Sequence, residues 1–344
     1  MNAIPDPSDQ RDRSVHYEEF SLLAENAAEL GIPFRPPQVR REFVVVDQEP
    51  GPESGPNSGP NSGPNPGPNS GPNSGPNSGQ RVSALVWGNA APDEIDLVLV
   101  HGGAQNAHTW DSVALALDRP LVAIDLPGHG HSDHRDDHAY WPHENAAAIA
   151  TAIRALAPTP RVIVGMSLGG LTSIALAAHA PDLVGHLVLV DVTPGVDREK
   201  ASAIAQFVDG PEYFESFDEI LERTILFNPT RTEQSLRRGV LHNAVATGDG
   251  RWRWRYDLPR RGSGEGDDGR VLPGLERLWD AIEASTMPLA LARGANSPVV
   301  SDDDVAELLR RRPDAEVVVF DGAGHSIQGD RPAELAEFLA ARLA

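Results

Sequence analysis

The chain has 344 residues, with 29 Lys and Arg against 50 Asp and Glu, so its formal net charge at pH 7 is −21. A surface this acidic repels nucleic acids and anionic membranes, and we expect neither as the main partner. The sequence contains no cysteine, which excludes disulfides, iron–sulfur clusters, thiolate metal sites and a cysteine nucleophile. We find neither a signal-peptide pattern nor an apolar run long enough for a membrane span, so we expect a cytoplasmic protein.

Residues 15–30 have apolar side chains at helical spacing and predict a short amphipathic helix that ends at Gly31. Residues 42–47 and 82–87 predict the two strands of a hairpin. Between them, residues 50–79 repeat Gly-Pro-Asn-Ser and carry no apolar side chain other than proline. Nothing offsets the entropy lost on ordering such a segment, so we expect a disordered insertion at the hairpin tip, with a partner-binding arm as the alternative.

From residue 95 onward, apolar runs alternate with helical patterns, which is typical of a parallel sheet covered by helices on both faces. We therefore predict an α/β fold with a mostly parallel central sheet. The expected strands are 96–100, 121–125, 161–164, 186–191, 289–293 and 316–320, and the expected helices are 110–117, 144–156, 168–179, 302–311 and 332–343.

The alternation stops after the sixth expected strand, and residues 193–286 look mainly helical. A segment inserted there lies above the carboxyl ends of the strands, where open α/β sheets bind ligands, so we interpret it as a lid. The expected organisation is an N-terminal extension (1–40), the first part of the core (41–192), the lid (193–286) and the second part of the core (287–344).

The sequence Gly-Met-Ser-Leu-Gly at 165–169 directly follows an expected strand and opens an expected helix. This is the Gly-x-Ser-x-Gly pattern in the strand–turn–helix context that raises a nucleophilic serine above the sheet. A serine hydroxyl needs a base, and His325 lies in a Gly-rich loop between the last expected strand and the last expected helix. We therefore predict Ser167 as nucleophile and His325 as its base.

Together with His-Gly-Gly at 101–103 and Asp-Leu-Pro-Gly-His-Gly-His-Ser at 125–132, these motifs make residues 40–344, apart from the repeat, resemble the lidded α/β-hydrolases. The resemblance implies a carboxylate that orients the histidine, most often after the strand expected at 289–293, but Ser297 stands at that position. Family members with a relocated acid carry it at the end of the preceding strand, which favours Asp191. The alternatives are the three aspartates that begin the helix at 302–311, namely Asp302, Asp303 and Asp304.

The resemblance and the glycine pattern assign the oxyanion hole to the backbone N–H groups of Gly103 and Leu168. We interpret the alternating basic and aromatic stretch at 251–256 as a strand-like or extended part of the lid, and we predict that its Trp252 and Trp254 face the substrate. An arginine of that stretch could contact a substrate carboxylate. The histidine-rich loop at 129–143 could suggest a metal site, but its first two histidines belong to the family-like motif, so we expect no metal there.

The predicted function is a serine hydrolase that cleaves a carboxylic ester or a related small acyl substrate without a cofactor. Within the same fold, a carbon–carbon bond hydrolase of vinylogous diketones and a cofactor-free perhydrolase or haloperoxidase-like activity are alternatives. A non-catalytic ligand-binding protein is the alternative of another class, because fold alone does not decide function.

Overall fold

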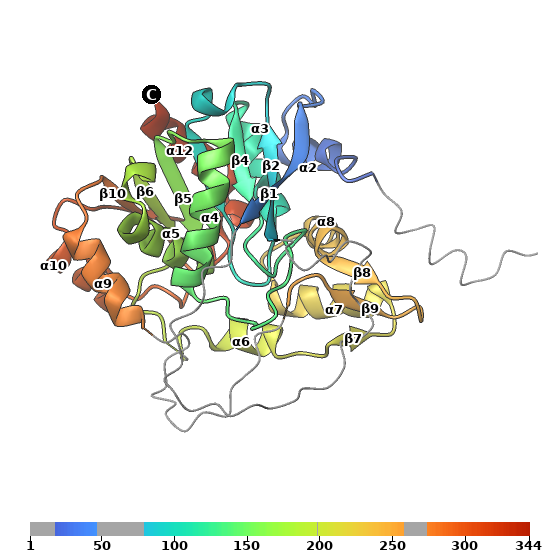
Figure 1. Ribbon diagram of the computed structural model, residues 1–344. Helices are drawn as coiled ribbons and strands as arrows, with labels where there is room; N and C mark the ends of the chain where they lie inside the picture. The colour runs from blue at the N-terminus through green and yellow to red at the C-terminus, as the bar shows by residue number, and fades with distance from the viewer. Residues whose placement is uncertain (1–17, 47–78, 198, 258–273) are drawn as a thin grey trace, which may run out of the picture.

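The computed structural model describes residues 18–46, 79–197, 199–257 and 274–344 (Figure 1). The Gly-Pro-Asn-Ser repeat up to residue 78 and the start of the predicted N-terminal helix at 15–17 lie outside the described residues. The predicted helix begins later than expected, at Leu23, and ends as predicted at Gly31, which adopts the left-handed conformation with φ 68°.

A sheet of eight strands forms the centre of the molecule, in the order β1-β2-β4-β3-β5-β6-β10-β11. The hairpin strands β1 and β2 run antiparallel, β2 is antiparallel to β4, and every other pairing is parallel. The predicted α/β fold with a mostly parallel sheet is therefore confirmed. The strands are β1 (Val39–Val46), β2 (Gln80–Trp87), β3 (Leu97–Val100), β4 (Leu121–Ile124), β5 (Val162–Met166), β6 (Leu187–Val190), β10 (Leu289–Gly294) and β11 (Glu316–Phe320).

Helices cover both faces of the sheet (Figure 1), because the central strands are apolar on both sides and bury every residue. One face carries α4 (Pro142–Leu156), α5 (Leu168–His179), α9 (Leu275–Ala284) and α10 (Asp302–Arg311). The other carries α2 (Leu23–Leu30), α3 (Asp111–Leu117), α11 (Ile327–Asp330) and α12 (Pro332–Leu343). Short 3-10 turns are η1 (Pro92–Glu94), η2 (Ala107–Trp110) and η3 (Pro181–Leu183).

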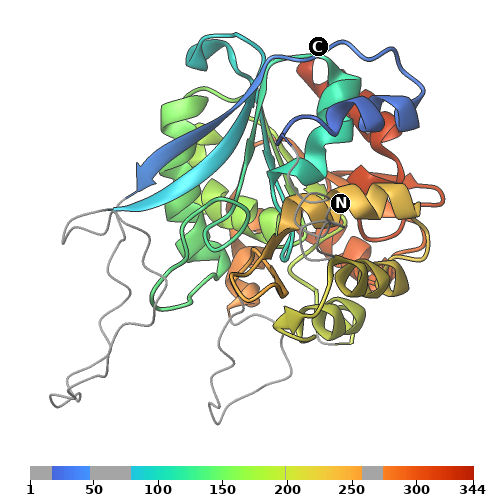
Figure 2. The ribbon, with the colours of Figure 1, turned by 90° about the vertical axis from the view of Figure 1, so that its right-hand side faces the viewer.

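The segment predicted to be inserted after β6 contains α6 (Ser202–Val208), α7 (Phe217–Phe227) and α8 (Glu233–Asn243). It also contains a three-stranded antiparallel sheet, in which β9 (Trp252–Trp254) lies between β7 (Tyr213–Phe214) and β8 (Ala244–Ala246). The strand β9 falls in the stretch expected to be extended, whereas β7 and β8 were not predicted. These elements share a small apolar core of their own and lie together at one end of the molecule (Figure 2). Helix α9 falls within the same predicted segment, but it packs against α5 and its apolar side chains join the main core.

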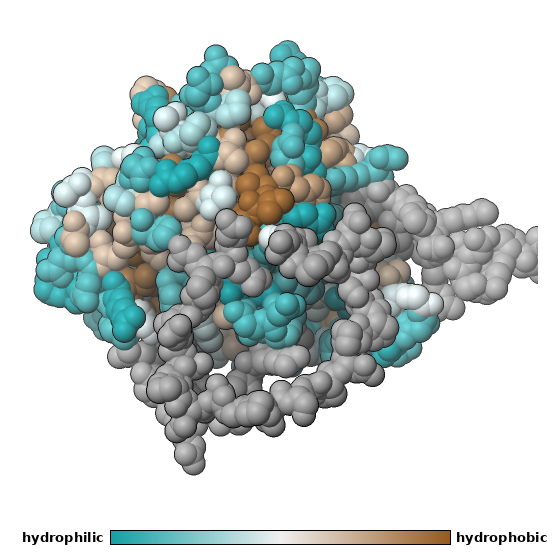
Figure 3. Space-filling model, in the orientation of Figure 1, coloured by the Kyte–Doolittle hydropathy of each residue, from teal (hydrophilic) through white to brown (hydrophobic). Residues whose placement is uncertain are grey.

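None of the described helices combines the length and the apolar character that crossing a bilayer would require. The face shown in Figure 3 is largely hydrophilic, with an apolar patch where Figure 1 places β1. On this edge strand, Phe43 and Val45 are 46% and 60% exposed.

Candidate active site

Ser167 lies on the turn between β5 and α5 in a conformation that side chains rarely adopt, with φ 50° and ψ −120°. The turn is possible because its glycines allow the backbone to approach very closely. A Cβ on Gly165 would stand 2.4 Å from the carbonyl oxygen of Gly169, and a Cβ on Gly169 would stand 2.4 Å from that of His101. Such strain at a non-glycine residue is typical of functional sites. The turn presents Ser167 at the carboxyl end of the sheet, half-buried on the wall of a cavity.

The loop between β11 and α11 brings His325 to a hydrogen bond with Asp191. The Nδ1 of His325 lies 2.8 Å from Oδ2 of Asp191, whose side chain is fully buried at the end of β6. A carboxylate can only accept, so Nδ1 carries the proton and the lone pair of the ring is on Nε2. Asp191 also accepts the backbone N–H of Gly294 at 2.9 Å and the hydroxyl of Ser297. These contacts fix the carboxylate toward the imidazole.

Ser297, at the position where the family resemblance implies the acid, is thus a hydrogen-bond donor to Asp191. The three alternative aspartates make other contacts. Asp302 pairs with Arg293 at 2.6 Å, and its side chain is 94% exposed. Asp304 is buried between Lys200, at 2.8 Å, and Ser301, whose side chain caps α10. Asp303 is exposed at the start of the same helix. Of the predicted acids, only Asp191 has a contact with His325 among the described residues.

The glycine loop after β3 lies beside the serine turn. A Cβ on Gly102 would stand 3.1 Å from Cβ of Ser167, and one on Gly103 would stand 3.9 Å from Cβ of Leu168. Within the described part of the chain, the backbone N–H groups of Gly103 and Leu168 make no hydrogen bond. Both are therefore available as donors close to Ser167.

Two side chains hold this glycine loop in place. His101 accepts the N–H of Leu126 on Nε2 at 2.9 Å, so its proton is on Nδ1, which donates to the carbonyl of Gly102 at 2.7 Å. Gln105 accepts the N–H of Gly102 at 3.2 Å and donates to the hydroxyl of Ser326 at 3.4 Å. The loop that carries His325 is thus linked to the glycine loop. Neither His101 nor Gln105 was among the predicted site residues.

The cavity has a volume of about 610 Å³ and brings together Gly103, Ser167 and His325 with side chains of α6, α7 and α8. Of the two predicted tryptophans, Trp254 lines the cavity and Trp252 does not. Trp252 packs instead against Phe217 in the apolar core of the inserted segment, with ring centroids 5.4 Å apart. Trp252 and Trp254 are two residues apart and therefore lie on the same face of β9. The alternation in the sequence thus could not decide which of them reaches the cavity.

The arginines of the same stretch do not line the cavity. Arg251 pairs with Asp249 at 2.8 Å. Two arginines that the sequence analysis did not single out line it instead, Arg231 and Arg238. Arg238 pairs with Glu29, whereas Arg231 donates to Ser235 at 2.6 Å and makes no ion pair within the described ranges. The Nε of Arg231 is buried without a hydrogen-bond partner there.

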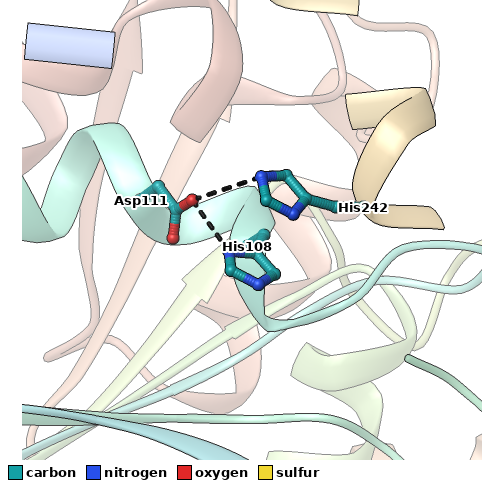
Figure 4. A group of neighbouring side chains, drawn as sticks. All are labelled: His108, Asp111 and His242. Atoms are coloured by element: carbon teal, nitrogen blue, oxygen red, sulfur yellow. Dashed lines mark hydrogen bonds and ion pairs between the residues drawn. The ribbon is translucent and has the colours of Figure 1, made fainter. Parts of the chain in front are cut away.

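The histidines of the 129–143 loop make separate contacts. His129 donates from Nδ1 to the carbonyl of Pro127 at 3.0 Å, and burial lowers its pKa to about 3. Burial likewise lowers the pKa of His131 to about 4. His138 pairs with Asp257 at 2.5 Å, which ties the stretch after β9 to the core. A different group, missed by the sequence analysis, brings His108 and Asp111 of the core together with His242 of α8 (Figure 4).

Comparison with known proteins shows which proteins the chain is similar to. The profile of the Alpha/beta hydrolase family matches residues 97–338. The esterase Rv0045c of Mycobacterium tuberculosis is 40% identical over 335 residues, which cover 95% of this chain and 96% of that protein. A structure of that esterase, from a study of its inhibition by transition metals, aligns with a TM-score of 0.76 at 39% identity over 95% of this chain and 99% of the other.

A second relative, 2-(acetamidomethylene)succinate hydrolase of Mesorhizobium japonicum, is 28% identical over 239 residues, covering 69% of this chain and 83% of the relative. A solved structure of an E-2-(acetamidomethylene)succinate hydrolase aligns with a TM-score of 0.67 at 27% identity over 77% of this chain and 95% of the other. Because the family profile spans most of the chain and a relative with 40% identity covers 95% of it, the chain belongs to the alpha/beta hydrolase family, and its predicted class as a hydrolase is confirmed.

Proposed function

We propose that the protein is a serine esterase in which Ser167 is the nucleophile, His325 the base and Asp191 the orienting acid. The observation that carries this proposal is the 2.8 Å hydrogen bond between Nδ1 of His325 and the buried carboxylate of Asp191, in a loop that lines the same cavity as Ser167. With the Nδ1 proton engaged, Nε2 is the basic nitrogen that can accept the serine proton. The 40% identity to an esterase supports the same activity.

In the first half of the reaction, His325 takes the proton of Ser167 while Oγ attacks the ester carbonyl carbon. The carbonyl oxygen becomes an oxyanion, which accepts hydrogen bonds from the N–H groups of Gly103 and Leu168. When the tetrahedral intermediate collapses, the C–O bond to the alcohol breaks and His325 protonates the leaving oxygen. An acyl-enzyme on Ser167 and a free alcohol result.

In the second half, His325 removes a proton from a water molecule that attacks the acyl carbon. Collapse of the second intermediate returns the proton to Ser167 and releases the carboxylic acid. Asp191 stabilises the imidazolium that forms in both halves and keeps the ring in the required tautomer. The reaction consumes one water and needs no cofactor.

The position of Arg231 is evidence that the substrate carries an anionic group. Arg231 lines the cavity and has no carboxylate of a described residue within ion-pair distance, although Asp330 and Glu29 act on its charge from further away. Guanidinium groups bind carboxylates through paired hydrogen bonds. The similarity to a hydrolase of a substituted succinate supports the same substrate class. We therefore propose an ester whose acyl part also carries a free carboxylate, so that Ser167 attacks the ester group and Arg231 binds the carboxylate.

The inserted segment, predicted as residues 193–286, acts in this proposal as the lid that covers the bound substrate. Side chains of its helices α6, α7 and α8 line the cavity opposite the serine turn. Closure over the substrate excludes water other than the attacking molecule and strengthens the electrostatic interactions at the oxyanion.

A fluorophosphonate probe tests the nucleophile directly. We expect the intact mass of the wild-type chain to increase by one adduct, and the mass of Ser167→Ala to remain unchanged. Ser202→Ala, which alters an exposed serine at the start of α6, is the matched control and should be labelled like the wild type. Absence of an adduct on the wild type would contradict an activated serine. Labelling of Ser167→Ala would show that another residue is the nucleophile.

A substrate panel tests the reaction. We expect turnover of carboxylic esters, with anionic acyl groups preferred over neutral groups of equal size. Turnover of vinylogous diketones without turnover of any ester would overturn the esterase assignment and support carbon–carbon bond hydrolysis by the same serine.

A further inference from the structure

Three buried side chains beside the cavity form a compact group of metal-ligating atoms that the proposed esterase mechanism does not use. His108 lies in η2, Asp111 begins α3, and His242 is in the last turn of α8 (Figure 4). The Oδ2 atom of Asp111 is 2.9 Å from Nδ1 of His108 and 3.9 Å from Nε2 of His242. Tetrahedral coordination with bonds of about 2.0–2.1 Å places ligand atoms about 3.3 Å apart, so these separations bracket a metal site.

Neighbouring side chains and backbone groups hold these three residues in place through hydrogen bonds. The other nitrogen of His108, Nε2, lies 3.1 Å from a carboxylate oxygen of Glu19, which is the histidine–carboxylate arrangement common in zinc proteins. Asn106 accepts the backbone N–H of His108 at 3.0 Å and donates to the backbone carbonyl of His242 at 3.1 Å. One asparagine thus fixes the backbone of both histidines.

Asp111 provides an independent indication that a ligand is missing. Its side chain is only 2% exposed, and its Oδ1 atom is buried without a hydrogen-bond partner in the described part of the chain. An unpartnered carboxylate oxygen in a buried site costs free energy unless a cation or a donor satisfies it, and an ion that both carboxylate oxygens of Asp111 bind would satisfy this one. All three side chains also line the cavity that contains Ser167, so a bound ion would keep one coordination position open to it.

We propose that His108, Asp111 and His242 bind one divalent transition-metal ion, for which Zn²⁺ is the best match. Two imidazole nitrogens and one carboxylate oxygen are the ligand types that Zn²⁺, Co²⁺ and Ni²⁺ share. The ion replaces the proton between His108 and Asp111, and Glu19 retains its hydrogen bond to His108. The rings of His108 and His242 stack at 3.7 Å with an angle of 10°, so one ring rotates on binding to direct its lone pair at the ion.

Such an ion would join the inserted segment to the core, because two ligands come from the core at η2 and α3 and the third from α8. The proposal is independent of the esterase mechanism, since none of its ligands takes part in the predicted triad. Ligands from two parts of the chain also imply that the ion stabilises the folded arrangement of both.

Equilibrium dialysis of the full chain against Zn²⁺ after treatment with a chelator, followed by metal analysis, tests the site. We expect about one equivalent in the wild type and at least tenfold weaker binding in His242→Gln and in Asp111→Asn. His143→Gln, which alters an exposed histidine at the start of α4, is the matched control. His325→Gln should bind Zn²⁺ like the wild type, which separates this site from the proposed catalytic histidine.

Co²⁺ provides a second measurement that does not depend on the folding of any variant, because a tetrahedral site gives this ion a strong visible absorption. We expect that band in the wild type, and we expect Zn²⁺ to remove it and to raise the wild-type Tm. Failure of the wild type to bind Zn²⁺, undiminished binding in both His242→Gln and Asp111→Asn, or loss of binding in His325→Gln would each overturn the proposal. A failed fluorophosphonate reaction would leave it intact.

Discussion

The pair formed by Asp191 and Ser297 allows a sharp test of which residue assists His325. The hydroxyl of Ser297 donates to Oδ2 of Asp191, the same oxygen that accepts from Nδ1 of His325. A carboxylate at position 297 would therefore lie next to the imidazole of His325. The perturbation is the swap Asp191→Ser/Ser297→Asp, compared with its two single variants.

The expected magnitudes follow from charge. Asp191→Ser removes the acid, and loss of that acid costs a serine hydrolase about 10⁴-fold in kcat. Ser297→Asp places a second carboxylate about 4 Å from Asp191, where two like charges repel by about 4 kcal/mol at an effective dielectric of 20. The free energy of unfolding should fall by an amount of that order. The swap removes the repulsion and restores one carboxylate, so kcat should recover to within about 100-fold of the wild type, the loss expected from a misplacement near 1 Å.

Initial rates on an ester give kcat, and urea unfolding gives the stability of each variant. Asp302→Asn is the control, because among the described residues that exposed side chain pairs only with Arg293. Its loss should leave kcat within about twofold of wild type, as for other surface ion pairs. Wild-type kcat in Asp191→Ser, or an equal loss in Asp302→Asn, would refute the role of Asp191. A swap no faster than Asp191→Ser would refute the argument that position 297 reaches His325.

Three further predictions concern the cavity, the turn and the effect of acid. Arg231→Gln should raise KM for anionic esters about 10- to 100-fold, the value of hydrogen bonds to a charged group, and leave neutral esters unaffected; an equal rise in Arg251→Gln, an arginine outside the cavity, would contradict it. Gly169→Ala should lower the free energy of unfolding by about 1–3 kcal/mol, the cost of overpacking, because the added Cβ meets backbone oxygens at 2.4 Å. The control in thermal unfolding is Gly248→Ala, whose added Cβ meets no atom of a described residue within 4 Å. His129 has its folded pKa lowered by burial to about 3, so its contribution to stability is complete above its unfolded pKa and is lost as pH falls toward 3. Between pH 6.5 and 5 the loss is about 2 kcal/mol. Urea unfolding should therefore show that the free energy of unfolding of His129→Asn falls by that much less than the free energy of the wild type over this pH range. An equal fall in both proteins would contradict the role of His129.

The sequence predicted the main sheet and its helices because their signals are local. Apolar runs such as 97–100 and 187–190 are buried on both faces, and the glycines around Ser167 mark a turn that few other residues permit. The site could be predicted from the same strands, because the carboxyl ends of parallel strands lie at one edge of the sheet. Ser167, Asp191 and the loop of His325 all follow such ends. The choice of Asp191 over Asp302 could be argued only from the family resemblance, because both follow strand ends.

The remaining features depend on long-range contacts that no local pattern encodes. The strands β7 and β8 have only two and three residues, too few for an alternation to be visible, whereas β9 lies in the alternating stretch at 251–256. All three strands are stabilised by the apolar core that they share with α7 and α8. Whether Trp252 or Trp254 reaches the cavity depends on that packing. The group of His108, Asp111 and His242 joins positions more than a hundred residues apart along the chain, and only the docking of α8 on the core brings them together.

The N-terminal segment, whose role the sequence did not reveal, contributes charges to the same docking. Glu29 on α2 accepts from Arg238 and from the hydroxyl of Thr232 on the adjoining part of the inserted segment, the latter at 2.8 Å. Arg238 is only 4% exposed, and a buried guanidinium without its carboxylate is strongly destabilising. Glu19 contacts His108 at 3.1 Å, and hydrogen bonds from His108 and Arg41 lower its pKa to about 2 although burial acts in the opposite direction. The segment before β1 therefore supports the cavity wall from outside, and α8 depends on it for the pairing of a buried charge.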